Sequence, residues 1–164
     1  MRLKSLILTL SLFGVIACHD NTDRDREWDI YPTIILISVE DPQGNDLLNP
    51  EVEGNIADRG IKAIYKGDAF EKDSVVNNAS RVYLAVFRGL QTDTLANGRY
   101  VLTLGEFAGN KDYRNEEIEI DWNDGSRNTI AFDSKFSWKD DKPSVERVFY
   151  LDGKKTEFPI KVIK

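Results

Sequence analysis

Apolar and polar residues alternate along much of the second half of the chain, with the period of two that is typical of a strand with one buried face. The clearest case is 117–122, where three apolar residues face one way and three acidic residues the other. The turn formers at 123–126 predict a hairpin to the next strand. That strand places four apolar residues in register: Ile130, Phe132, Phe136 and Trp138.

Shorter apolar runs predict further strands, each ending at turn-forming residues. The run 33–39 is apolar on both faces, which favours a strand that is buried on two sides or that changes sheets. The run 81–88 has the same two apolar faces and predicts a central strand. The runs 61–66 and 69–71 predict a short hairpin, and the run 99–104 predicts a strand after the tight turn 95–98. The last two runs, 145–151 and 158–163, lie on either side of an Asp-Gly turn at 152–155.

No segment has a sustained helical period. The segment 47–59 contains Pro50 and Gly54 and has no clear period, so it predicts a long connection with at most one helical turn. Many short strands separated by Gly, Asn and Asp indicate an all-β chain, a single antiparallel β-sandwich over residues 28–164. The pattern leaves the strand order open, and a small barrel is an alternative pairing.

The amino-terminal stretch has a different pattern. Arg2 and Lys4 precede an uncharged apolar run that is too short to span a bilayer, and a small residue, Ala17, stands before Cys18. This order predicts a lipoprotein signal peptide over residues 1–17, cleavage between Ala17 and Cys18, and a lipid on the Cys18 sulfur. An ordinary signal peptide with a chance cysteine is the alternative, but the chain has 1 Cys and therefore no second thiol to pair with it.

The polar residues 18–27 predict a lipidated cysteine followed by an acidic, flexible tether, so the membrane would be contacted through the lipid on Cys18. Loss of Arg2 and Lys4 with the signal would take the formal charge from −6 to −8. A chain this acidic is a poor partner for nucleic acid, whose phosphates require a basic face.

The scarcity of His and Cys excludes several kinds of catalytic site. The 1 His, His19, lies in the predicted tether, and Cys18 is expected to be acylated. A Ser-His-Asp set would have to use a histidine in the tether, and a Cys-His pair would in addition have to use an acylated cysteine. A zinc site needs three or four His or Cys ligands, more than the chain has. It also has no glycine-rich phosphate loop. We therefore expect no catalytic residues, no metal and no cofactor.

Carboxylates leave two alternatives to a purely structural interpretation. Glu117, Glu119 and Asp121 share one strand face, which is typical of a solvated face, although a glycosidase also needs two carboxyls in a cleft. A second cluster, Asp41, Asn45 and Asp46, has oxygen ligands suited to Ca²⁺ but lacks EF-hand spacing, and the same residues form turns.

Aromatic residues provide the candidate ligand contacts. Trp138 at a strand end and Tyr113 in the loop after Gly109 could stack on a sugar ring or close the end of the sandwich. Tyr100 follows a tight turn at a strand start, so we predict a tyrosine corner whose hydroxyl bonds to backbone a few residues upstream. The aromatic residues predicted to be core are Trp122, Phe132, Phe136 and Phe149.

A family resemblance rests on the lipobox (residues 15–18), on the acidic stretch that follows Cys18, and on two further motifs. The run 37–41, which continues into Gly44-Asn45-Asp46-Leu47-Leu48, and the closing run Tyr150-Leu151-Asp152-Gly153-Lys154 resemble surface lipoproteins of Bacteroidota for which we know no catalytic residues. The resemblance implies an immunoglobulin-like or transthyretin-like sandwich, lipid-anchored on the outer membrane and facing the cell surface.

These features favour a non-catalytic binding or assembly module for a glycan or an envelope protein, with a small carboxylate-dependent hydrolase as the alternative. The connections 47–59 and 106–115 are the expected carriers of contact residues, because loops on a rigid scaffold can vary freely. A pocket with two convergent carboxylates would favour the hydrolase.

Overall fold

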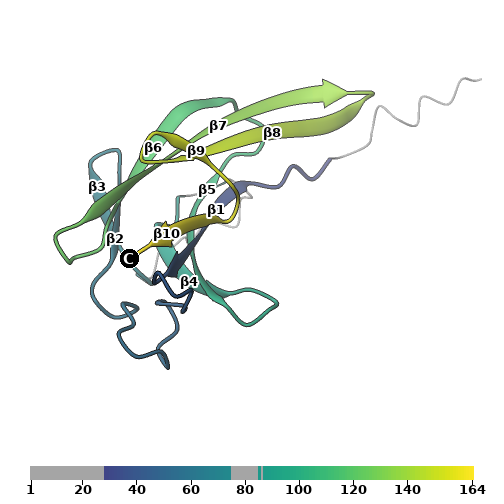
Figure 1. Ribbon diagram of the computed structural model, residues 1–164. Helices are drawn as coiled ribbons and strands as arrows, with labels where there is room; N and C mark the ends of the chain where they lie inside the picture. Colours follow the sequence, from purple (N-terminus) through teal and green to yellow (C-terminus); the bar gives the residue numbers. More distant parts are fainter. Residues whose placement is uncertain (1–27, 75–84, 86) are drawn as a thin grey trace, which may run out of the picture.

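The computed structural model describes residues 28–74, 85 and 87–164, and in this part all regular secondary structure is β-strand (Figure 1). The strands are β1 (Thr33–Glu40), β2 (Lys62–Tyr65), β3 (Asp68–Glu71), β4 (Leu90–Thr94), β5 (Tyr100–Phe107), β6 (Tyr113–Asp121), β7 (Arg127–Lys139), β8 (Lys142–Leu151), β9 (Lys154–Thr156) and β10 (Ile160–Ile163).

The strands form two sheets that share one core. The smaller sheet has the order β10-β1-β5-β4 and the larger has the order β3-β2-β6-β7-β8-β9. Neighbouring strands are antiparallel except β1 and β10, which are parallel. The predicted all-β class with antiparallel sheets is therefore confirmed, and the two-layer arrangement is that of a β-sandwich.

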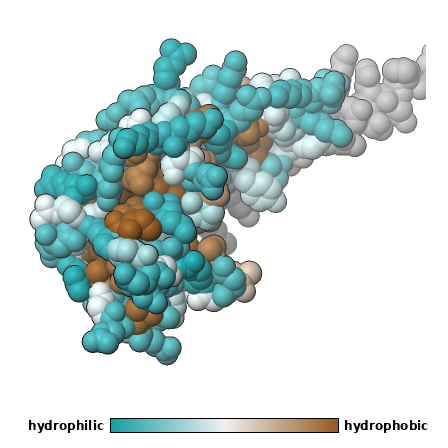
Figure 2. Space-filling view, in the orientation of Figure 1, coloured by the Kyte–Doolittle hydropathy of each residue, from teal (hydrophilic) through white to brown (hydrophobic). Residues whose placement is uncertain are grey.

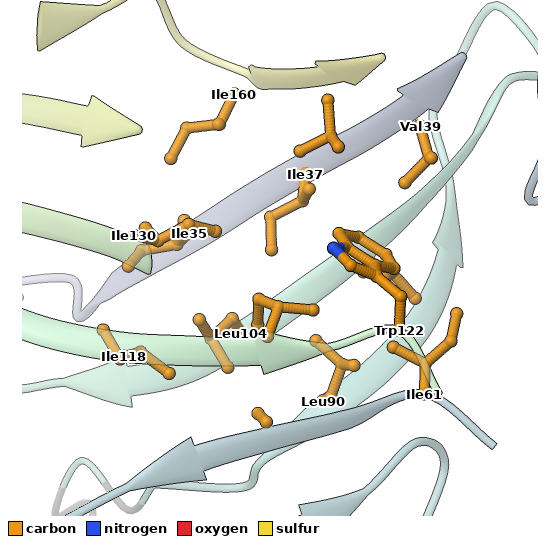
Figure 3. Close-up of a cluster of buried hydrophobic side chains, with 14 of the residues drawn as sticks. Ile35, Ile37, Val39, Ile61, Leu90, Leu104, Ile118, Trp122, Ile130 and Ile160 are labelled. Atoms are coloured by element: carbon orange, nitrogen blue, oxygen red, sulfur yellow. The ribbon is translucent and has the colours of Figure 1, made fainter. Parts of the chain in front are cut away.

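Alternation along the strands explains why the core forms between the sheets. Ile35 and Ile37 of β1 point toward Ile118 of β6 and Ile130 of β7, and all four side chains are fully buried (Figure 3). Burying one such side chain contributes roughly 1.5–3 kcal/mol. Trp122 is also buried, and its indole Nε1–H donates to Asn128 Oδ1 at 2.7 Å, so its polar atom keeps a partner.

The first strand is buried on one face, not on two. Thr33, Ile35, Ile37 and Val39 face the core, whereas Ile34 on the other face is 38% exposed. The expectation of two buried faces is wrong because no further layer of described residues covers the outer side of the smaller sheet at Ile34.

The central strand expected over 81–88 falls mainly on residues outside the described part. The three described residues, Ala85, Phe87 and Arg88, are not in a strand. The strand that follows, β4, begins at Leu90 and forms an edge of the smaller sheet, and its short polar pattern was not recognised in the sequence.

The carboxyl-terminal strands separate into different sheets. The predicted Asp-Gly turn pairs β8 with the short β9, not with 158–163. After β9 the chain leaves the larger sheet, and β10 joins the smaller sheet by pairing with β1 from Ile37 to Glu40. The buried Glu40 of β1 pairs with Lys161 of β10 at 3.0 Å, which helps to hold β10 in place, and with Arg99, directly before β5, at 2.8 Å.

Other predicted turns are confirmed. The β2–β3 hairpin turns at Lys66 and Gly67, both with positive φ, and β6 and β7 are joined by 122–126. The segment 47–59 is a connection without a helix. The long connection expected over 106–115 is wrong, because β5 extends to Phe107 and β6 starts at Tyr113, which leaves five residues between them.

Candidate functional site

The predicted anchor lies outside the described residues. This holds for the signal peptide over 1–17, for Ala17 and Cys18 at its cleavage point, and for the tether over 18–27 with His19. These remain predictions from the sequence.

Trp138 lies near the end of a long β7–β8 hairpin that projects beyond the other strands (Figure 1). β6 pairs with β7 as far as Ser134, so the outer part of β7 pairs with β8 alone. Trp138 is 55% exposed, and its ring contacts Phe136 edge to face with 5.7 Å between the ring centroids. It is therefore accessible to a ligand, but it does not line the groove described below.

Tyr113 has a structural role in the described fold. It begins β6, its ring packs against Phe107 and Phe132, and its hydroxyl accepts a hydrogen bond from the Ala108 N–H at 3.0 Å. A tyrosine at a strand start with its hydroxyl bonded to upstream backbone is the arrangement that we expected at Tyr100.

At Tyr100 the main chain, not the hydroxyl, makes the anchoring contact. Its N–H donates to Asp46 Oδ2 at 2.8 Å, and its hydroxyl has no hydrogen bond to another described residue. The sequence could not show which tyrosine at a strand start has upstream backbone within reach of its hydroxyl.

The cluster Asp41, Asn45 and Asp46 forms a turn. Asp41 accepts hydrogen bonds from Gln43 N and from the main chain and side chain of Asn45, and the side-chain bond is the main reason that the pKa of Asp41 is lowered. Asp46 accepts from the N–H groups of Leu48 and Tyr100. The carboxylate oxygens that would bind Ca²⁺ already accept hydrogen bonds, from main-chain N–H groups or, for Asp41 Oδ2, from the Asn45 side chain, which supports the interpretation as a turn.

The acidic row on β6 faces solvent and is largely paired. Arg127 of β7 contacts Glu119 at 2.8 Å and Asp121 at 3.1 Å, and Glu117 accepts from the Asn115 side chain. Within the described ranges, no group of three or more His, Cys, Asp or Glu side chains is placed to hold a metal ion.

A groove that sequence reasoning missed lies between the start of β1 and the β8–β10 region. Its volume is about 530 Å³, within the range typical of small-ligand sites. The apolar side chains that line it are Pro32, Ile34, Leu36, Phe149 and Phe158. The rings of Phe149 and Phe158 are stacked, with 4.8 Å between their centroids. Figure 2 shows an apolar patch, surrounded by hydrophilic residues, in the region where Figure 1 draws β10, although no residue of β10 itself lines the groove.

Four polar residues complete the lining: Thr33, Asp93, Thr103 and Arg147. Arg147 Nε donates to the Thr33 hydroxyl at 2.7 Å, which links β8 to the start of β1. Surrounding atoms desolvate the guanidinium and lower the pKa of Arg147, and no described carboxylate forms an ion pair with it. Opposite Arg147 in the β7–β8 register is Ser134, whose buried hydroxyl has no hydrogen-bond partner in the described structure.

The residues of the groove come from three segments, 32–36, 93–103 and 147–158, which lie far apart in the sequence. Phe149 alone was singled out, as a core residue, and it is buried with its edge in the groove. The available signal was the apolar outer face of the run 33–39, which has no reason to be apolar if water is its only neighbour.

The described part contains no helix that is long and apolar enough to cross a membrane. Comparison of the chain with protein-family models, with curated proteins and with solved structures found no match.

Proposed function

We propose that the protein is a lipid-anchored protein of the cell envelope that acts as a non-catalytic binding module, with its ligand in the groove beside β1. The observation that carries this proposal is an apolar groove that contains the Arg147 guanidinium, which has no ion-pair partner among the described residues. Sites of this kind hold a ligand by apolar contact and orient it by a few polar groups.

The composition of the groove favours binding over hydrolysis. Among the residues that line it, Asp93 is the one carboxylate, and its Oδ1 accepts from the Thr94 N–H. A glycosidase uses two carboxyls flanking the scissile bond. The chemistry of the groove therefore supports recognition of a ligand rather than its cleavage.

The location of the protein is part of the same proposal. The lipobox before Cys18 and the acidic stretch after it support attachment to the outer membrane with the fold facing the cell surface. The immunoglobulin-like or transthyretin-like type of the sandwich also belongs to the proposal, and the two packed sheets with mostly antiparallel pairing support it.

The binding proposal can be tested by site-specific photo-crosslinking of the full-length chain in cell envelopes. A photoreactive phenylalanine analogue replaces Phe158, which is 46% exposed in the groove, or Lys155, which is exposed on β9 and outside the lining. We expect a discrete adduct from position 158 that position 155 does not give. Equal adducts from both positions, or none from position 158, would count against the groove as the binding site.

A further inference from the structure

The strand that borders the groove has a free edge over its first half. β10 pairs with β1 from Ile37 onward, and no other described strand lies beside residues 33–36 on that side. The C=O of Glu40 accepts from the Lys164 N–H, so the main-chain groups of Glu40 point toward β10. In a strand, the N–H and C=O groups of every second residue point to the same neighbouring strand. The N–H groups of Ile34 and Leu36 therefore point to the same side as those of Glu40, toward the position beside residues 33–36 that β10 does not reach.

The groove borders this open position and also extends over the neighbouring strands β5 and β4, where Thr103 and Asp93 line it. The Phe149–Phe158 stack and Arg147 lie toward the larger sheet, while the side chains of Ile34 and Leu36 lie on the outer face of β1. A chain added in line with β10 would thus place alternate side chains on two apolar surfaces. Unpaired N–H groups on an open strand edge are also the hydrogen-bond donors that an added strand uses.

Arg147 supplies the charge complementarity. Its Nε–H is fixed by the Thr33 hydroxyl, and its other N–H groups have no ion-pair partner among the described residues. The Arg147 side chain is exposed, so a carboxylate that binds beside it can accept charge-assisted hydrogen bonds from its remaining N–H groups.

We propose that the ligand is an extended polypeptide segment that adds to the free edge of β1 as a strand, with apolar side chains at alternate positions and one carboxylate against Arg147. This inference rests on the proposed binding function and names its ligand class. A glycan could stack on the phenylalanines, but it would not require the regular spacing of main-chain donors along Ile34 and Leu36.

The test is a fluorescence-anisotropy titration of the full-length chain in detergent with a labelled synthetic peptide of alternating valine and threonine and one central glutamate. A matched peptide carries glutamine in place of the glutamate. We expect the glutamate peptide to bind about ten- to hundredfold more tightly, the value of a hydrogen bond to a charged group. The Arg147→Met variant should lose this preference, whereas Lys154→Met, a change on exposed β9, should keep it.

Two further peptides test the strand geometry. Each is N-methylated on alternate residues, one in each phase, so that each blocks one edge of the peptide. Strand addition predicts that one of the two stops binding while the other continues to bind. Equal binding of both, or equal binding of the glutamate and glutamine peptides to the parent chain, would overturn the inference.

The result also separates this inference from the proposed function. If no peptide binds but a polysaccharide suppresses the adduct at position 158, the ligand is not a polypeptide, and the proposed binding function still holds. Absence of both the adduct and peptide binding would overturn both proposals.

Discussion

Two tyrosines at strand starts, Tyr113 and Tyr100, differ in what their hydroxyls contact. The hydroxyl of Tyr113 accepts from the Ala108 N–H at 3.0 Å, and that of Tyr100 has no partner in the described part of the chain. Tyr113→Phe should lower the free energy of unfolding by about 0.5–1.5 kcal/mol. Tyr100→Phe is the matched control and should change it by less than about 0.5 kcal/mol. Urea unfolding compares the two, and a larger loss for Tyr100→Phe would contradict the assignment.

A second prediction at this scale concerns Glu116, which accepts from the Tyr65 hydroxyl at 2.5 Å and pairs with Lys66 at 3.0 Å. Burial alone would raise the pKa of Glu116, but these two contacts outweigh it and lower the pKa below its ordinary value of 4.5. The stabilisation is therefore complete above pH 4.5 and is lost as the pH falls through the lowered pKa.

Glu116→Gln should consequently be less stable than the parent at neutral pH, and the difference should shrink as the pH is lowered through this window. Urea unfolding across acid pH measures it, with Glu157→Gln, an exposed glutamate outside any described contact, as the control. A difference between Glu116→Gln and the parent that does not change with pH would argue against an ionised Glu116 as its cause.

The β7–β8 hairpin gives a prediction at the scale of an element. Its turn residues Asp140 and Asp141 both have positive φ, of 50° and 56°, a conformation in which glycine avoids a cost of about 1–2 kcal/mol per residue. Asp141→Gly should therefore raise the free energy of unfolding by about 1 kcal/mol or somewhat less. Ser144→Gly, within β8, should lower it by roughly 0.5–1 kcal/mol. Thermal unfolding measures both, and destabilisation by Asp141→Gly would contradict the turn geometry.

Elements whose partners are near in sequence could be predicted, and those with distant partners could not. The alternation around Ile118 and the turn at 123–126 specify the β6–β7 hairpin locally, as found. The parallel pairing of Ile37 with Ile160 joins residues 123 positions apart, so the run 158–163 gave no indication of which sheet it enters. The groove was missed for the same reason, because Leu36 and Arg147 meet only after the two sheets pack.

At the scale of the whole molecule, attachment to a membrane depends on one residue. We expect Cys18→Ala to leave an unprocessed or soluble chain, because the lipid that would be attached to the sulfur supplies the membrane affinity. Ser11→Ala, a change within the apolar run, should be processed normally. Detergent-phase partition of the two variants measures this, and unchanged membrane partition of Cys18→Ala would refute the lipid anchor.

The account of the molecule as a binding module depends on an open edge of β1 that a ligand closes. Amide hydrogen exchange of the full-length chain, resolved by residue, tests it most directly. In the free protein we expect fast exchange at Ile34 and Leu36 and slow exchange at Ile35 and Ile37, which pair with β5. Addition of the glutamate peptide should slow exchange at Ile34 and Leu36. Slow exchange of these two amides already in the free protein would contradict the account. So would fast exchange that stays unchanged when the ligand identified by crosslinking at position 158 is added.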